Sequence, residues 1–99
     1  MKFFVGIARF RLDLAHCSSL KDKRRVMKSI LDRLGNNKLM GAAEVSGRDA
    51  WKTGVIGVTC LSSSRDLVLK TIESARRMIE RDGVEIISSE QWVLKPEDI

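Results

Sequence analysis

The stretch Ser18-Ser19-Leu20-Lys21-Asp22-Lys23-Arg24-Arg25-Val26-Met27-Lys28 opens a helix, and the place of this helix in the chain decides the fold. Ser19 is a preferred N-cap residue, and Asp22 is spaced to complete a capping box, so we expect the helix to begin at Leu20. Gly35-Asn36-Asn37 tolerates a left-handed C-cap and predicts its end. Apolar residues recur at helical spacing between these limits and predict one buried face, made of Leu20, Met27, Ile30, Leu31 and Leu34.

Basic residues crowd the first half of this helix. Five of them, against one acid, lie between Leu20 and Lys28, where the helix dipole and the free N–H groups disfavour cations. This excess favours a binding role toward an anion, phosphate above all. The candidate anion-binding or nucleic-acid-binding residues of the helix are Lys21, Lys23, Arg24, Arg25 and Lys28.

Lys23 differs from the other four because it falls within the apolar arc of the helix. We expect its side chain to leave the end of the core and reach water, the alternative being that it points into a local anion site. Such a site would use Lys21, Lys23 and the free N–H groups after Ser19 to hold one phosphate beside residues 15–18. Ser19 and Asp22 can instead satisfy those N–H groups themselves, and we favour this second arrangement.

Residues 3–14, which precede the helix, alternate as a strand does. One face predicts core packing and carries Phe4, Gly6, Ala8, Phe10, Leu12 and Leu14. The other face begins with the apolar Phe3, Val5 and Ile7 and turns basic at Arg9 and Arg11, two candidate extensions of the basic surface. A monomer seldom leaves such an apolar patch in water, so we expect a homodimer through the open face of the sheet.

The middle of the chain predicts a hairpin. Residues 39–46 form a short strand, Gly47-Arg48-Asp49 begins the turn, and residues 55–61 form a second strand. This second strand is almost continuously apolar and β-branched, so it belongs in the centre of the sheet.

A second helix and a final strand complete the chain. Ser63 and Asp66 repeat the capping-box spacing, which predicts a helix from Leu67 to a stop at Asp82-Gly83. Residues 84–94 predict a strand of weaker pattern, and residues 95–99 an acidic, frayed tail.

The order strand, helix, strand, strand, helix, strand predicts one α+β domain over residues 1–99. Two βαβ halves joined by a hairpin form a ferredoxin-like split βαβ sandwich, a four-stranded antiparallel sheet with two helices on one face. A KH domain is disfavoured because no GXXG loop joins two helices, and an RRM because the central strands lack paired aromatics. Neither objection excludes RNA as a partner.

Composition bounds the function further. The 99 residues carry a net charge of +5, with a pI near 9.6, which favours nucleic acid or another polyanion as partner. No run of about 18 apolar residues or signal-peptide core is present, so we expect a cytoplasmic protein with no membrane role. Cys17 and Cys60 are too few for a disulfide framework or a metal cluster and are interpreted as structural thiols.

Taken together, several of these segments resemble the YlxP-like family of small bacterial proteins, also called domain of unknown function 503. The resemblance implies a ferredoxin-like α/β sandwich of uncharacterised biochemical function, in proteins often encoded beside transcription and translation factors, with no established catalytic residue. Met40-Gly41-Ala42 departs from the stronger β-branched strand common in the family. The matching segments are Ser19-Leu20-Lys21-Asp22-Lys23-Arg24-Arg25-Val26, Arg9-Phe10-Arg11-Leu12, Ala43-Glu44-Val45, Trp51 and Val55-Ile56-Gly57-Val58.

Enzyme chemistry finds little support in the sequence. His16 and Cys17 are adjacent, but neighbouring side chains in an extended loop point apart. Glu44 lies in an apolar strand and is interpreted as an edge carboxylate paired with a nearby Lys or Arg, in preference to a general base. P-loop, dinucleotide, HExxH and CxxC motifs are all missing, as is the Arg-containing glycine-rich loop of acylphosphatases, which share the expected fold. We therefore expect no catalytic residue, no cofactor and no metal.

Two tryptophans need a role. Trp51 and Trp92 could stack on a base, but we favour core or dimer packing for each.

The function that the sequence favours is a non-enzymatic domain that binds RNA or a ribosomal particle through its basic first helix, in translation or ribosome function. The alternative is a dimeric protein-interaction or small-ligand module whose charged helix face is merely solvated.

Overall fold

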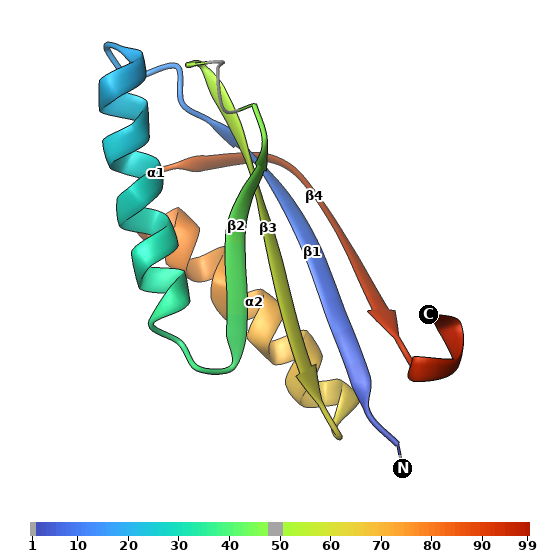
Figure 1. Cartoon of the computed structure of the whole chain (residues 1–99). Helices are drawn as coiled ribbons and strands as arrows, with labels where there is room; N and C mark the ends of the chain where they lie inside the picture. The colour runs from blue at the N-terminus through green and yellow to red at the C-terminus, as the bar shows by residue number, and fades with distance from the viewer. Residues whose placement is uncertain (1, 48–50) are drawn as a thin grey trace.

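Strand β1 (Phe4–Asp13) lies in the middle of the structure, a computed structural model that describes residues 2–47 and 51–99 (Figure 1). Its alternation is the one expected: Gly6, Ala8, Phe10 and Leu12 are buried, whereas Ile7, Arg9 and Arg11 are exposed. The elements that follow are α1 (Leu20–Gly35), β2 (Met40–Ser46), β3 (Thr53–Ser62), α2 (Arg65–Arg81), β4 (Glu85–Leu94) and the 3-10 helix η1 (Pro96–Asp98).

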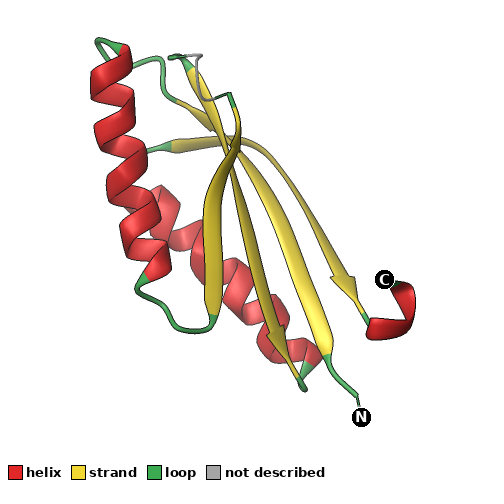
Figure 2. Ribbon diagram, in the orientation of Figure 1, coloured by secondary structure: helices red, strands yellow, loops and turns green. Residues whose placement is uncertain are grey.

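The described strands form one antiparallel sheet in the order β2-β3-β1-β4. β1 pairs with β3 from Phe4 opposite Ser62 to Asp13 opposite Thr53. β3 therefore lies between two neighbours, as its apolar sequence predicts. Both helices cover the same face of the sheet and leave the other face open (Figure 2). The predicted ferredoxin-like βαββαβ sandwich is confirmed.

The core lies between this face and the two helices because each element contributes the apolar stripe that its sequence period dictates. α1 buries Met27, Ile30 and Leu34, and α2 buries a matching row from Val68 to Ile79. These side chains meet the inward residues of the central strands in one cluster, which includes Phe10, Leu12, Ile56 and Val58.

α1 begins at Leu20 with Ser19 as its N-cap, as predicted, but the capping box is not completed, because Asp22 bonds the N–H of Ser18 and not that of Ser19. Ser19 Oγ accepts the N–H of Asp22 at 3.0 Å, and the carboxylate of Asp22 accepts the N–H of Ser18 at 3.0 Å. The end of the helix differs from expectation: Asn36 is the C-cap with a φ of −74°, so no left-handed residue is used there. The N–H of Asn36 donates instead to the carbonyl of Asp32 at 3.1 Å.

The cap of α2 is Ser64, not Ser63. Ser64 Oγ accepts the N–H of Leu67 at 3.2 Å, and the helix begins at Arg65, two residues before the predicted Leu67. The reason lies just upstream, where Ser62 Oγ accepts the N–H of Ser64 at 3.0 Å and places Ser64 at the helix entrance. Asp66 pairs with Lys70 at 2.9 Å and does not complete the capping box.

The chain ends in more order than predicted. The backbone N–H of Lys95 donates to Asp98 Oδ2 at 2.9 Å, which closes η1 over residues expected to be frayed.

Gly83, with a φ of +77°, follows the end of α2 as predicted. Of the turn expected at Gly47-Arg48-Asp49, Arg48 and Asp49 lie outside the described residues. In the described part of the chain, no helix has the length and apolar character needed to cross a membrane.

Candidate nucleic-acid interface

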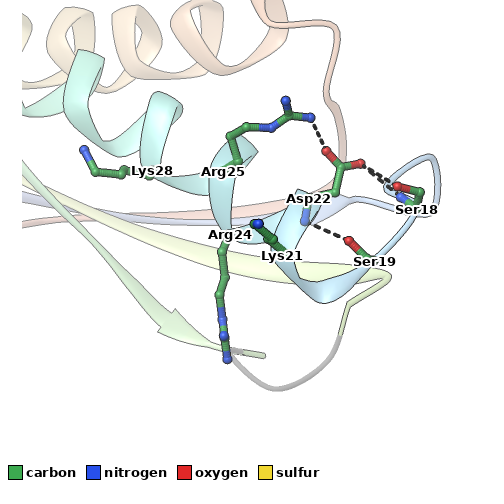
Figure 3. Close-up of a pocket in the computed structure, with 7 residues that line it drawn as sticks. All are labelled: Ser18, Ser19, Lys21, Asp22, Arg24, Arg25 and Lys28. Carbon is green, nitrogen blue, oxygen red and sulfur yellow. Dashed lines mark hydrogen bonds and ion pairs between the residues drawn. The ribbon is translucent and has the colours of Figure 1, made fainter.

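Four cations occupy neighbouring turns on one side of α1: Lys21, Arg24, Arg25 and Lys28 (Figure 3). Their spacing of three, four and seven residues brings them to one side of the helix, and they extend over about 10 Å along its axis. All four are exposed. Together with Ser18, Ser19 and Asp22 they line an open hollow of about 590 Å³.

Acidic neighbours restrain two of these cations. Arg25 pairs with Asp22 one turn earlier, and Lys28 Nζ lies 2.7 Å from Asp32 Oδ2 one turn later. The side chains of Arg25 and Lys28 are nevertheless 80% and 77% exposed. Lys28 and Asp32 are both exposed, and such a pair contributes little net stability, so Lys28 can exchange its carboxylate for a phosphate at low cost. The carboxylate of Asp22 is only 21% exposed and also accepts the N–H of Ser18, so it is held in place more firmly than that of Asp32.

Two pKa shifts favour the charged forms of Asp22 and Lys28. The backbone hydrogen bond from Ser18 lowers the pKa of Asp22, and the side chain of Arg25 lowers it further. The hydrogen bond to Asp32 raises the pKa of Lys28 above its ordinary value of 10.5. Asp22 is the acid among the residues that line the hollow at the start of α1.

The N-terminus of α1 does not form the separate phosphate pocket that we considered. Ser19 Oγ accepts the N–H of Asp22, one of the N–H groups after Ser19, as in the arrangement that we favoured, whereas Asp22 accepts the N–H of Ser18, which precedes them. Lys21 stays in water, but Lys23 turns away from this end of the helix. Two of the groups that the pocket needed are therefore engaged elsewhere.

The structure contradicts both sequence-based interpretations of Lys23, namely that its side chain reaches water and that it points into a local anion site. Its side chain is 1% exposed, its ammonium group donates to the carbonyl of Gly47, and it lies 3.2 Å from Glu44 Oε2. Because the residue sits in the apolar arc of α1, its aliphatic stem follows the core, and Cε approaches Gly54 beside Leu14 and Met27. The amine finds its partners inside the protein and does not add to the basic surface.

Arg9 and Arg11 are a second correction. The alternation of β1 places both on the sheet face opposite the helices, so they do not extend the basic surface of α1. Arg9 pairs with Glu90, and its guanidinium carbon lies 5.6 Å from the centroid of the Trp92 ring. Arg11 lines a small hollow of about 290 Å³ on this sheet face, together with Ser46, Val55 and Ser88.

A second hollow, of about 480 Å³, opens between α1 and β2, and the sequence did not indicate it. Arg24 and Lys28 line it as well as the first hollow, so they join the two into one surface. Its remaining lining comes from Met27, Leu31, Asp32, Ala43 and Glu44. Only the packing of α1 beside β2 brings these residues together, because they are remote in sequence.

The residues weighed for catalysis lie outside this surface or are otherwise engaged. Cys17 Sγ comes within 3.9 Å of His16 Nε2, so the pair does not point apart as expected. Burial, followed by the charge of Asp22, raises the pKa of the Cys17 thiol, which keeps it protonated and weakly nucleophilic. Glu44 is the predicted edge carboxylate and pairs with Lys23. Among the described residues, no cluster of three or more His, Cys, Asp or Glu side chains is arranged for a metal ion.

The tryptophans also depart from one expectation. Trp51 is 45% exposed and Trp92 is 42% exposed, so neither is a core residue. Trp92 lies on the open face of the sheet, opposite Ile7 in the pairing of β1 with β4. Cys60, in contrast, is the expected structural thiol, since it is buried and burial raises its pKa.

The fold and the surface define a ferredoxin-like α+β domain with a basic first helix on one side and an open sheet on the other. The chain belongs to the family described as Protein of unknown function (DUF503), whose model matches residues 5–91. This family is the one indicated by the sequence resemblance. The chain is 30% identical over 76 residues to the uncharacterized protein YlxP of Bacillus subtilis (strain 168), an alignment covering 77% of this chain and 83% of that protein.

A solved structure shares the fold at low sequence identity. The structural-genomics protein YJCS superposes with a TM-score of 0.55 at 6% identity, over 89% of this chain and 96% of that one. The de novo designed protein Foldit4 superposes with a TM-score of 0.47 at 17% identity, over 96% of both chains. The match to YJCS supports the architecture alone, because fold does not imply function.

Proposed function

We propose that this chain is a non-enzymatic RNA-binding or ribonucleoprotein-binding domain that acts in translation or ribosome function through the basic surface of α1. The observation that carries the proposal is the row of four exposed cations, Lys21, Arg24, Arg25 and Lys28, around two connected hollows. Phosphate oxygens would replace the carboxylates of Asp22 and Asp32 as partners of Arg25 and Lys28.

The kind of recognition follows from the side chains available. The surface offers Lys and Arg donors but no aromatic ring among its lining residues, so it suits phosphate contacts better than base stacking. Binding should therefore be strongly salt-dependent and weakly sequence-dependent. The choice of RNA over other polyanions rests on the resemblance, which implies neighbours in transcription and translation.

The test is a triple substitution, Arg24→Ala, Arg25→Ala and Lys28→Ala, assayed by fluorescence anisotropy with a labelled single-stranded RNA at several salt concentrations. Loss of three phosphate contacts should flatten the slope of log K against log salt by about 2, at about 0.7 for each contact. Affinity should fall to a similar extent for RNAs of different sequence.

A matched control removes the same charge from the other helix. Lys70→Ala, Arg77→Ala and Arg81→Ala take three exposed cations from α2, so each triple variant carries a net charge of +5 − 3 = +2. Equal loss of affinity in both variants would mean that net charge, and not the surface of α1, governs binding. Unchanged affinity in the α1 variant would refute the proposal and leave the small-ligand or protein-interaction alternative.

A further inference from the structure

The sheet face opposite the helices exposes large apolar side chains. Ile7, Val45, Leu61 and Trp92 are 37%, 56%, 66% and 42% exposed, and they stand on four different strands. Ile7 and Val45 line an open hollow of about 410 Å³ together with Gly41, Ala43 and Gly57. An apolar surface of this extent is typical of an interface, because a monomer seldom leaves one in water.

The charge of this face distinguishes it from the basic helix. Its outward positions near the polar end carry Arg9 and Arg11 against Asp13, Glu85 and Glu90, although the chain as a whole is at +5. Arg9 is already paired with Glu90 and packed over Trp92. These five groups sum to 2 − 3 = −1, so the face does not attract a polyanion as the basic helix does, and two copies of the chain meet only a weak repulsion here.

The strand register makes one row of this face complementary to itself. One row across the sheet reads Trp92, Ile7, Thr59, Gly41 from β4 to β2, and the next reads Glu90, Arg9, Gly57, Ala43. Consider a two-fold axis that lies in the interface, parallel to the strands and between β1 and β3. This axis places each row of one copy over the same row of the other copy, in reverse strand order. In the first row, Trp92 and Ile7 of one copy then lie over Gly41 and Thr59 of the other. In the second row the place above Gly57 is already taken by Val45, whose Cγ1 would lie 3.0 Å from a Cβ at that glycine.

The area of the face suits a stable dimer. Four strands about 4.8 Å apart, with about ten residues rising 3.3 Å each, make a flat area on the order of 600 Å². Because side chains protrude from the sheet, the accessible area is larger than this flat value. It is therefore comparable with the area of about 800 Å² that each partner buries in a specific interface.

We propose that a second copy of this chain covers the open face in a two-fold dimer, with Trp92 of each copy seated over Gly41 of the other. The two sheets pack face to face and the helices lie on the outside. Each basic surface of α1 therefore stays in solvent, at opposite sides of the dimer. The dimer does not depend on RNA binding and is tested without RNA.

Sedimentation equilibrium over a wide range of protein concentration gives the first test. The expected mass is 2 × 11.2 = 22.4 kDa at high concentration. A particle of 11.2 kDa at every concentration up to about 500 µM, well above the micromolar range of specific complexes, overturns the dimer. An oligonucleotide that quenches Trp92 fluorescence in a Trp51→Phe background would also overturn it, by assigning the face to nucleic acid.

Gly41→Val is the most informative variant. A Cβ at Gly41 would lie 3.5 Å from Thr59 Cγ2, an ordinary contact, so the monomer accepts the side chain. The dimer should be weakened about 30-fold or more, because the new side chain occupies the place of the partner's indole. Adding Trp92→Ala to Gly41→Val should restore part of the affinity, an effect that requires the two positions to face each other across the interface.

Leu67→Ala on α2 is the matched control for Trp92→Ala, since the two side chains are 41% and 42% exposed. Trp92→Ala should raise the dissociation constant about 30-fold, and Leu67→Ala should leave it unchanged. A dimer that keeps its affinity in folded Gly41→Val would place the interface elsewhere and overturn the proposal. Circular dichroism of each variant establishes that the monomer fold is intact.

Discussion

Replacing Lys23 with Met removes one half of a buried ion pair while keeping the length of the side chain. Lys23 is 1% exposed and its partner Glu44 is 17% exposed, so the variant leaves a largely buried carboxylate without its nearest cation. Breaking a buried pair in this way costs about 3 to 5 kcal/mol. Residual exposure of Glu44 lets water compensate part of the loss, which places the expected cost near 3 kcal/mol.

Thermal unfolding followed by circular dichroism measures this cost. For a domain of this size about 1 kcal/mol corresponds to 4 or 5 °C, so the Tm should fall by about 12 to 15 °C. The double variant Lys23→Met with Glu44→Leu removes both charges and should recover most of that loss. Recovery should be incomplete because the carbonyl of Gly47 also loses its donor.

The same variant separates the two interpretations of Lys23. At a temperature where it is fully folded, Lys23→Met should bind RNA as the unmodified protein does, because the ammonium group lies inside the protein. A loss of affinity equal to that of Arg24→Ala would place the amine at the surface and refute the buried pair. A decrease in Tm of less than about 4 °C would refute it as well.

Three further variants test local structure by thermal unfolding. Ser64→Ala should lose about 1 kcal/mol of stability through its cap, whereas Ser63→Ala should change less than about 0.5 kcal/mol. Gly6→Ala should cost about 1 to 3 kcal/mol, because its Cβ would lie 2.4 Å from Val68 Cγ1. Asp22→Asn should be less stable than the unmodified protein at pH 7. Since the folded pKa of Asp22 is lowered, this gap should close as pH falls below 3.8, the ordinary value, and a gap that persists at pH 2 would contradict it.

Much of the fold was predictable because its determinants are local. The alternation of residues 3–14 specified both faces of β1, and helical spacing specified the buried stripes of α1 and α2. Ser19 and Asp22 marked the start of α1 within a single turn of chain. The cap of α2 was missed by one residue because three consecutive serines are equivalent in sequence, and only the hydrogen bond from Ser64 to Ser62 selects between them.

By itself, then, the sequence determined the βαββαβ order, the apolar stripes and the concentration of cations on α1. The tertiary structure decided where individual charges go. It turned Lys23 inward, because the packing of α1 against β2 brings Glu44 and Gly47 within reach of its amine. It separated Arg9 and Arg11 from the basic helix, because a sheet lies between them. It also placed Trp92 in the same row as Gly41. The alternation within one strand is a local property that the sequence shows, whereas the pairing of residues between four strands is a long-range property of the fold.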